Sequence, residues 1–244
     1  MSSVDLATFK ERRAQALANA PVFRELCWRC RQPDFSCYCP WLQPFDPKIH
    51  FVILMHPIEY RRRIATGRMS HLSLAHSRLI VGHHLDANEE LKTLLAEPWR
   101  HCVMLYPGRK SQNLTKMKAS ERRAWVPPGK TVTVLVIDGT WSTARQMVNQ
   151  NAILQAVERV GFIPPTPSNF RVRKQPRVDC YSTIEAIHHT IELLGPACDF
   201  STQDRLHDRL LYVFDNMVNR QIDLANAHPS VTMPGRQSRH RLSR

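Results

Sequence analysis

The sequence predicts an α/β fold with a mostly parallel sheet and helices on both of its faces. Three apolar runs, at residues 49–55, 101–106 and 131–137, have the length and composition of strands buried on both faces. Segments with helical periodicity separate these runs, and such alternation is typical of a parallel sheet with crossover connections. A chain of 244 residues is long enough to bury one sizeable core.

Helical periodicity and turn residues place the other elements along the chain. We expect an N-terminal helix within residues 1–22, because good helix formers are followed there by Pro21. Residues 162–167 contain too many prolines for a central strand, and residues 169–174 are compatible with a short edge strand. Residues 80–82 fit either a short strand or the exit of a helix. The remaining helices are predicted at residues 66–79, 88–96, 142–149, 183–194 and 202–225, and residues 120–125 and 153–157 fit either a helix or a turn.

The charge of the chain favours a nucleic-acid partner. Lys and Arg number 34 against 21 Asp and Glu, which gives a formal net charge of +13. Such an excess matches the phosphate backbone of a nucleic acid, although solvated basic faces also occur without that role. Much of the charge is clustered at residues 61–63, 171–174 and 236–244, and we expect the basic segment 229–244 to be a disordered tail.

The chain carries no signal for membrane insertion or secretion. No apolar run approaches the roughly 20 residues needed to cross a bilayer, and the N-terminus lacks the basic-then-apolar order of a secretory signal. We therefore expect a cytoplasmic protein with no membrane partner, and nothing in the sequence predicts a protein partner.

A compact group of cysteines predicts a metal site. In a cytoplasmic chain, such a group is more often a metal site than a pair of disulfides. Two tight turns that each supply two thiolates match the tetrahedral coordination of structural Zn²⁺, a site closed by four protein ligands and therefore not catalytic. Reduced structural cysteines are the alternative. We assign residues 23–46 to a zinc knuckle whose ligands are Cys27, Cys30, Cys37 and Cys39.

A polar turn follows the last of the three predicted strands and is the most informative stretch of the chain. Asp138 and Gly139 end the strand, and Thr140 and Trp141 lead into the next helix. Ligands of parallel α/β proteins bind in the crevice outside the carboxyl ends of the strands, so the turn predicts a binding site. The alternative is an ordinary strand-to-helix connection in which Thr140 or Ser142 caps the helix and Trp141 packs.

Polar residues also follow the other two predicted strands. His56 and Glu59 come after the first strand, and the Tyr106-Pro107-Gly108 turn comes after the second. Loops that follow parallel strands converge at one edge of the sheet, so we expect these residues to share a cleft with Asp138. His56 is equally compatible with a hydrogen-bonded histidine at a strand end. Glu59 is also compatible with an ion pair to the neighbouring arginines or with a cap on the helix behind it.

A fourth polar segment, Tyr181-Ser182-Thr183, lies at the start of a predicted helix. The N-terminus of a helix favours an anionic group such as a carboxylate or a phosphate. Ser182 with Glu185 also fits a capping box, which needs no ligand. The sequence contains no G-x-G-x-x-G after a strand, no Walker loop and no G-x-S-x-G elbow, so those motifs support no alternative function.

Together these blocks resemble the DTW-domain family, the tRNA-uridine aminocarboxypropyltransferases. The family takes its name from a D-x-T-W motif, which Asp138-Gly139-Thr140-Trp141 matches. D-x-T-W alone is a weak signal, whereas the ordered set of blocks over residues 24–225 is specific. The other matching blocks are Cys27/Cys30/Cys37/Cys39, His56-Pro57 with Glu59, Tyr106-Pro107-Gly108 and Ser182-Thr183-Ile184-Glu185-Ala186.

The resemblance implies a SPOUT-like catalytic domain over residues 47–228, with a C-terminal trefoil knot at the cofactor site. It also implies S-adenosylmethionine as co-substrate and a tRNA uridine as acceptor. The 3-amino-3-carboxypropyl group would move to N3 of the uridine, with release of methylthioadenosine. Bacterial relatives act at position 47 of the tRNA variable loop, and other relatives act in the D-loop.

The resemblance also implies roles for individual residues of this chain. Asp138 is the candidate catalytic residue, either as a general base for the N3 proton or as an electrostatic anchor for the sulfonium. The expected tRNA-binding residues are Arg61, Arg62, Arg63, Arg171, Arg173 and Lys174. The expected cofactor-binding residues are His56, Tyr106, Pro107, Gly108, Gly139, Thr140, Trp141, Tyr181, Ser182, Thr183 and Glu185.

Two other functions fit the same residues. A SPOUT-type methyltransferase would bind the same cofactor and RNA but would present the methyl carbon of the sulfonium to the acceptor. A non-catalytic RNA-binding module would use the zinc knuckle and the basic clusters, and the polar residues of the sheet edge would serve only the structure.

Overall fold

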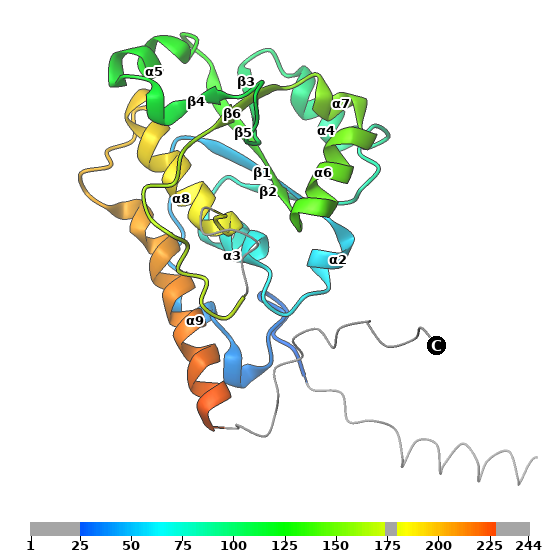
Figure 1. Ribbon diagram of the computed structural model, residues 1–244, viewed down its shortest axis with the longest axis vertical. Helices are drawn as coiled ribbons and strands as arrows, with labels where there is room; N and C mark the ends of the chain where they lie inside the picture. The colour runs from blue at the N-terminus through cyan, green and yellow to red at the C-terminus, as the bar shows by residue number, and fades with distance from the viewer. Residues whose placement is uncertain (1–24, 174–179, 228–244) are drawn as a thin grey trace, which may run out of the picture.

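A computed structural model describes residues 25–173 and 180–227 of the chain (Figure 1). The predicted N-terminal helix within residues 1–22, the predicted tail at 229–244 and Lys174 lie outside this part. The domain boundaries that we assign from the sequence therefore stay predictions.

The described residues form a six-stranded sheet in which all neighbouring strands are parallel. The strand order is β2-β1-β5-β3-β6-β4, so β5 lies in the interior of the sheet between β1 and β3. This arrangement confirms the predicted α/β class. The strands are β1 (His50–Met55), β2 (Arg78–Val81), β3 (Arg100–Leu105), β4 (Gln112–Asn113), β5 (Thr131–Asp138) and β6 (Glu158–Gly161).

Helices cover both faces of the sheet, as the sequence predicts (Figure 1). Alternate strand residues point to opposite faces, so Phe51 and Ile53 of β1 pack with one helix layer, and Val52 and Leu54 with the other. None of the described helices is both long and apolar enough to span a bilayer. The first layer contains α3 (Thr66–Ser73), α8 (Thr183–Leu194) and α9 (Arg209–Ala227), and the second contains α4 (Glu89–Ala96), α6 (Trp141–Gln150) and α7 (Ala152–Gln155).

Shorter helical segments complete the described chain. The α-helical ones are α2 (Pro57–Tyr60) and α5 (Ala119–Trp125). The 3₁₀ turns are η1 (Asp34–Ser36), η2 (Cys39–Trp41), η3 (Leu114–Lys116), η4 (Gly195–Cys198) and η5 (Leu206–Asp208).

Two predicted helices are shorter in the structure. The helix predicted at residues 66–79 ends at Ser73, because the N–H of Ala75 donates to the carbonyl of Phe45 at 2.9 Å instead of continuing the helix. β2 (Arg78–Val81) then begins within the last two residues of that range, which confirms the strand alternative for residues 80–82. The helix predicted at 202–225 begins only at Arg209, because Arg205 has a left-handed φ of 52° that an α-helix does not accommodate.

The sequence prediction also misplaces one edge of the sheet. The described part of the segment at 169–174 is not a strand. Instead β6 and β4 complete the sheet beyond β3, and neither is predicted from the sequence. They contain only four and two residues, which is too short to show a periodic pattern.

Residues 25–46, which we call the knuckle, pack against the first helix layer. Tyr38 and Phe45 are buried in the same core as α3, α8 and α9. The side chain of Arg220 in α9 donates to the carbonyl of Phe35 at 2.8 Å. The knuckle is therefore part of the folded body and not a separate appendage.

The carboxyl ends of the interior strands converge on one edge, which we call the carboxyl edge. Met55, the last residue of β1, pairs with Asp138, the last residue of β5. The loops after these two strands start from the same place, and the loop after β3 starts nearby. The beginning of α8 reaches this edge as well, because Thr183 contacts Asp138. The fold thus brings together blocks that are far apart in the sequence.

Candidate active site and cysteine cluster

Asp138 lies at the end of the interior strand β5 and is only 4% exposed. Its Oδ1 accepts a hydrogen bond from the hydroxyl of Thr183, the first residue of α8. Its Oδ2 is also buried and has no hydrogen-bond partner among the described residues. Leaving a buried acceptor without a partner is costly, and such groups concentrate at functional sites, so Asp138 is a strong candidate for a functional role.

Gly67 allows α3 to approach this carboxylate closely. A Cβ atom at position 67 would lie 2.5 Å from Oδ2 and 2.6 Å from Cγ of Asp138, so a larger residue would displace the carboxylate. Gly67 is the second residue of α3, and the N-terminal turn of a helix favours negative charge. The first turns of α3 and α8 therefore enclose the Asp138 carboxylate.

Burial raises the pKa of Asp138 to about 6. The negative charge of Glu59 also raises this pKa. The hydrogen bond from Thr183 and the positive charges of Arg173 and Arg68 lower it. With this pKa, the carboxyl group is mostly ionised at pH 7 and mostly protonated at pH 5. The group can therefore provide a negative charge or accept a proton near neutral pH.

Glu59 joins two loops that are far apart in the sequence. It is 3% exposed and pairs with Arg62 at 3.1 Å and with Arg173 at 3.6 Å. Arg62 belongs to the loop after β1, and Arg173 belongs to the segment that leads toward α8. The expected ion pair with a neighbouring arginine is therefore present, and it holds both loops beside the site.

Arg68 is a buried cation next to the site that the sequence prediction misses. It is 4% exposed, and burial lowers its pKa. Its Nη2 donates to the carbonyl of Tyr60 at 2.6 Å, and its guanidinium lies 4.9 Å from the centre of the Tyr60 ring. The available signal is Gly67, because glycine is unfavourable in the first turn of a predicted helix unless a close approach requires it.

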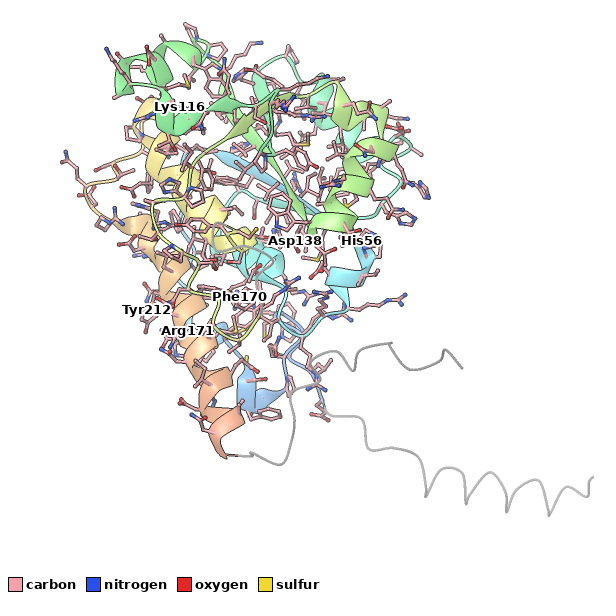
Figure 2. The ribbon with its side chains drawn as sticks, viewed as in Figure 1. His56, Lys116, Asp138, Phe170, Arg171 and Tyr212 are labelled. Carbon is pink, nitrogen blue, oxygen red and sulfur yellow. The ribbon has the colours of Figure 1, made fainter. Side chains whose placement is uncertain are left out.

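His56 contacts the candidate catalytic residue through its main chain. The N–H of His56 donates to the carbonyl of Asp138 at 2.9 Å, and its Nδ1 accepts from the N–H of Ile58 at 3.2 Å, which caps α2. Burial and the charge of His83 lower the pKa of His56. Figure 2 shows His56 and Asp138 close together, and Lys116, which follows the edge strand β4, away from them.

The Tyr106-Pro107-Gly108 turn leaves the end of β3. The N–H of Tyr106 donates to the carbonyl of Val160 at 2.9 Å, and the guanidinium of Arg159 lies 5.4 Å from the centre of its ring. Pro107 and Gly108 are exposed. Their main chain is therefore available to a ligand at the carboxyl edge.

The capping box at the start of α8 is present. The carboxylate of Glu185 accepts hydrogen bonds from the N–H and hydroxyl of Ser182 at 2.8 and 2.6 Å. It also accepts from the hydroxyl of Ser168 at 2.8 Å and from the N–H of Asn169 at 2.7 Å. Glu185 thus shapes the loop before the helix, and Thr183 is the residue of this block that contacts Asp138.

The predicted tRNA-binding arginines divide into two groups. Arg61, Arg63 and Arg171 are exposed, and Figure 2 shows Arg171 beside α9. Arg62 and Arg173 are half-buried in the ion pairs described above. The exposed group is the one that can meet a phosphate directly.

Residues 24–222 match the DTW domain. The chain belongs to the DTW domain family. It is similar to tRNA-uridine aminocarboxypropyltransferase 2 of Drosophila melanogaster, with 29% identity over 211 residues that cover 82% of this chain and 79% of the fly protein. Proteins of the same name from Mus musculus and Macaca fascicularis are 29% and 27% identical over 175 residues, which cover 70% of this chain and 57% of each relative. No solved structure matches the chain.

The other residues of the DTW motif have clear local roles. Thr140 caps α6, because its Oγ1 accepts from the N–H of Thr143 at 3.2 Å, and this confirms the capping interpretation. A Cβ atom at Gly139 would lie 2.7 Å from Thr143 Oγ1. Trp141 is 45% exposed and donates its indole N–H to Cys180 Sγ at 3.1 Å, so one part of the ring is anchored and another part is open.

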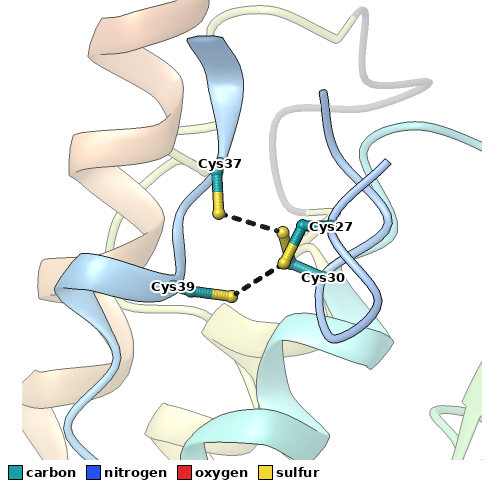
Figure 3. Close-up of side chains that lie close together, drawn as sticks. All are labelled: Cys27, Cys30, Cys37 and Cys39. Carbon is teal, nitrogen blue, oxygen red and sulfur yellow. Dashed lines mark hydrogen bonds between the residues drawn. The ribbon is translucent and has the colours of Figure 1, made fainter. Parts of the chain in front are cut away.

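The cysteines of the knuckle converge on one point (Figure 3). The Sγ atoms of Cys27 and Cys39 lie 3.7 Å apart, those of Cys30 and Cys37 lie 3.5 Å apart, and all four lie within 4.8 Å of one another. Tetrahedral Zn²⁺ with Zn–S bonds of about 2.3 Å places its sulfurs about 3.8 Å apart, so this set fits such an ion. All of these cysteines are free of disulfides.

The local chain acts differently on individual thiols of the cluster. Arg31 has a left-handed φ of 61°, and its N–H donates to the carbonyl of Cys27 at 2.8 Å, which closes the turn between Cys27 and Cys30. A hydrogen bond from the main chain of Cys30 is the largest influence that lowers the pKa of Cys27 to about 7. Burial instead raises the pKa of Cys37 and Cys39. Because metal binding requires deprotonated cysteines, a bound metal would displace the protons of these two thiols.

A second group with metal-ligand chemistry, His188, Glu192 and His207, belongs to an ion-pair network. Arg205 donates to Glu192 at 2.8 Å and to Asp208 at 2.7 Å, and His188 contacts Asp208 at 2.8 Å. The guanidinium already supplies the positive charge that these carboxylates need. We therefore interpret this group as a structural link between α8 and the start of α9.

Replacing Asp138 with Asn should change stability in a pH-dependent way. An Asp whose pKa rises from 3.8 to about 6 on folding destabilises the protein as pH rises through this range, because the folded state binds more protons. Asp138→Asn should therefore stabilise the protein at pH 8 by about 1 to 2 kcal/mol more than at pH 5. Urea unfolding at the two pH values measures this difference, with the exposed Asp223→Asn as control, and an equal effect at both values contradicts it.

The purified protein should carry about one zinc ion per chain. Cys30→Ser removes a buried ligand and should abolish stoichiometric zinc and lower the thermal unfolding temperature. Cys102→Ser lies outside the cluster and should leave the metal content unchanged. Metal analysis of the three proteins provides the measurement, and a metal-free wild-type chain that is fully folded would identify the cluster as reduced structural cysteines.

Proposed function

We propose that this protein transfers the 3-amino-3-carboxypropyl group of S-adenosylmethionine to N3 of a tRNA uridine and releases methylthioadenosine. One observation carries the proposal, which is the DTW match over residues 24–222 with the buried Asp138 of that motif at the carboxyl edge. The names of the fly, mouse and macaque relatives support it.

The residues of the carboxyl edge fit a sulfonium co-substrate. S-adenosylmethionine supplies a positively charged sulfur whose neighbouring carbons are electrophilic. Asp138 provides a buried negative charge for such a cation, whereas Glu59 is already paired with Arg62 and Arg173. The first turn of α8 favours a carboxylate. Glu185 would act indirectly, through the capping box. The proposed binding residues are His56, Tyr106, Pro107, Gly108, Gly139, Thr140, Trp141, Tyr181, Ser182 and Thr183.

The environment of Asp138 favours one of its two candidate roles. A general base must reach the nucleobase proton, whereas an anchor only has to lie near the sulfonium. Thr183 engages Oδ1, and Oδ2 lies against Gly67, so both oxygens face protein. We therefore assign the ionised carboxylate the role of an anchor, which orients the methylene of the aminocarboxypropyl arm toward the uridine.

Three exposed arginines are the proposed contacts to tRNA phosphates: Arg61 and Arg63 in the loop after β1, and Arg171 beside α9. Lys174, outside the described residues, stays in the predicted set. An unpaired uridine suits a site at a sheet edge, because loop bases can be extruded toward it. We propose uridine 47 of the variable loop as the acceptor, on the pattern of bacterial relatives, and the cytoplasm as the location.

The SPOUT-like trefoil knot is part of the same proposal. It is supported by the position of α8, whose first residue Thr183 lies against Asp138 at the end of β5. The parallel sheet with helices on both faces is compatible with such a knot.

Labelled co-substrate separates the proposed reaction from methyl transfer. tRNA incubated with the protein and carboxyl-labelled S-adenosylmethionine should acquire label, whereas the methyl label should leave in methylthioadenosine. Mass spectrometry of the digested tRNA then locates the modified uridine. Label that enters RNA only from the methyl group would identify a SPOUT-type methyltransferase, and no label from either source would favour a non-catalytic RNA-binding module.

Asp138→Asn should raise the KM for S-adenosylmethionine about 10- to 100-fold without changing tRNA affinity, because it removes a charged partner of the sulfonium. Wild-type transfer at subsaturating co-substrate should rise between pH 5 and pH 7 as Asp138, with its pKa of about 6, loses its proton. The variant should lose this rise. An unchanged KM with a much lower kcat would instead identify Asp138 as the general base.

A further inference from the structure

Trp28 is the most exposed large apolar side chain in the described part of the chain. It is 87% exposed, whereas the other exposed large apolar side chains of that part are 41% to 53% exposed. Tryptophan is costly to leave in water and is enriched where proteins bind other molecules. The role of Trp28 is not explained by packing, and the proposed transfer site does not use it.

The turn that carries Trp28 is held in a fixed shape. Cys27 and Cys30 flank it, and their sulfurs belong to the four-cysteine cluster. The N–H of Cys27 donates to the carbonyl of Gln32 at 2.8 Å, and the N–H of Arg31 donates to the carbonyl of Cys27 at 2.8 Å. An aromatic ring on a rigid turn loses little conformational freedom when it binds a partner.

The knuckle is fastened to the loop that follows β1. The side chain of Gln32 donates to the carbonyl of Arg63. The guanidinium of Arg31 lies 4.6 Å from the centre of the Tyr60 ring, which Arg68 also contacts. Figure 1 shows the knuckle at the same end of the molecule as α2, and α5 at the opposite end. Trp28 therefore has a fixed position relative to the carboxyl edge.

The charges near the turn indicate the kind of partner. Arg29 and Arg31 follow Trp28 in the same turn and are exposed, and the exposed Arg61 and Arg63 lie on the loop to which the knuckle is fastened. The exposed acidic residues of the knuckle are Glu25 and Asp34, so the four exposed arginines outnumber them. An aromatic ring among guanidinium groups suits a phosphate backbone with unpaired bases better than an apolar protein surface.

We propose that Trp28 stacks on an unpaired base of the tRNA and forms a second RNA contact, outside the site of transfer. The partner rests on the proposed function, whereas the contact itself rests on the exposure and setting of Trp28. The knuckle then does more than stabilise the fold, because it holds an aromatic ring at a fixed offset from Asp138.

Binding of tRNA to three variants tests this proposal. Stacking of one base on an aromatic side chain corresponds to a loss of about 5- to 140-fold in affinity on replacement by alanine. Trp28→Ala should weaken binding within that range, and Trp28→Phe should retain most of the affinity. Trp99→Ala is the matched control, because Trp99 is 43% exposed and immediately precedes β3 at the other end of the sheet.

Two further comparisons separate stacking from charge. Trp28→Ala should leave the salt dependence of binding unchanged, because no phosphate contact is lost. It should weaken binding of an RNA stem-loop and leave binding of a blunt RNA duplex of equal length unchanged. Wild-type affinity of Trp28→Ala for tRNA, or an equal loss on the duplex, would overturn the proposal.

Transfer assays on the same proteins test the stacking contact independently of the proposed reaction. Trp28→Ala should raise the KM for tRNA and leave the rate at saturating tRNA within about twofold. If the wild-type protein transfers no label from S-adenosylmethionine but Trp28→Ala still weakens stem-loop binding, the proposed reaction fails and the stacking contact stands. If transfer occurs and the variant binds normally, the stacking contact fails alone.

Discussion

The burial of one carboxylate at the end of β5 governs the arrangement of the carboxyl edge. Moving an ionised carboxyl group out of water is costly unless nearby dipoles and donors compensate. Here the compensation comes from two helix starts, since Thr183 donates to Oδ1 and the first turn of α3 approaches Oδ2 at Gly67. One oxygen is nevertheless left without a hydrogen bond among the described residues. A positively charged ligand would relieve that cost.

Residues of the family motifs also start the helices that surround this carboxylate. His56 caps α2, Thr140 caps α6, and Ser182 is the N-cap residue of α8 within a capping box. The structural and functional interpretations of these residues are therefore compatible. Each cap ends an extended segment and begins a helix at the same edge, so the positive ends of several helix dipoles point toward one region. Asp138 and Glu59 supply the negative charge that balances them.

The knuckle and the candidate site form one continuous set of contacts. Arg31 and Arg68 both contact the ring of Tyr60, and Gly67, next to Arg68, lies against Asp138. A segment with only short 3₁₀ turns has little regular structure of its own, so a cluster of four cysteines is an effective way to hold it. The shape of the loop after β1 therefore depends on the cysteine cluster as well as on the sheet.

Local patterns are enough to predict much of this protein. Strands buried on both faces need continuous apolar runs, so β1, β3 and β5 are visible in the sequence, and α8 is predicted with its observed bounds. The cysteine spacing and the DTW motif likewise lie within short segments. The partners of Asp138 do not, because Gly67 and Thr183 are separated from it by 71 and 45 positions and only folding brings them together. The burial of Arg68 and the hydrogen bonds that Glu185 accepts from Ser168 and Asn169 could not be predicted for the same reason. The short strands β4 and β6 are likewise not predicted, because their pairing depends on neighbouring strands that only the fold brings into place.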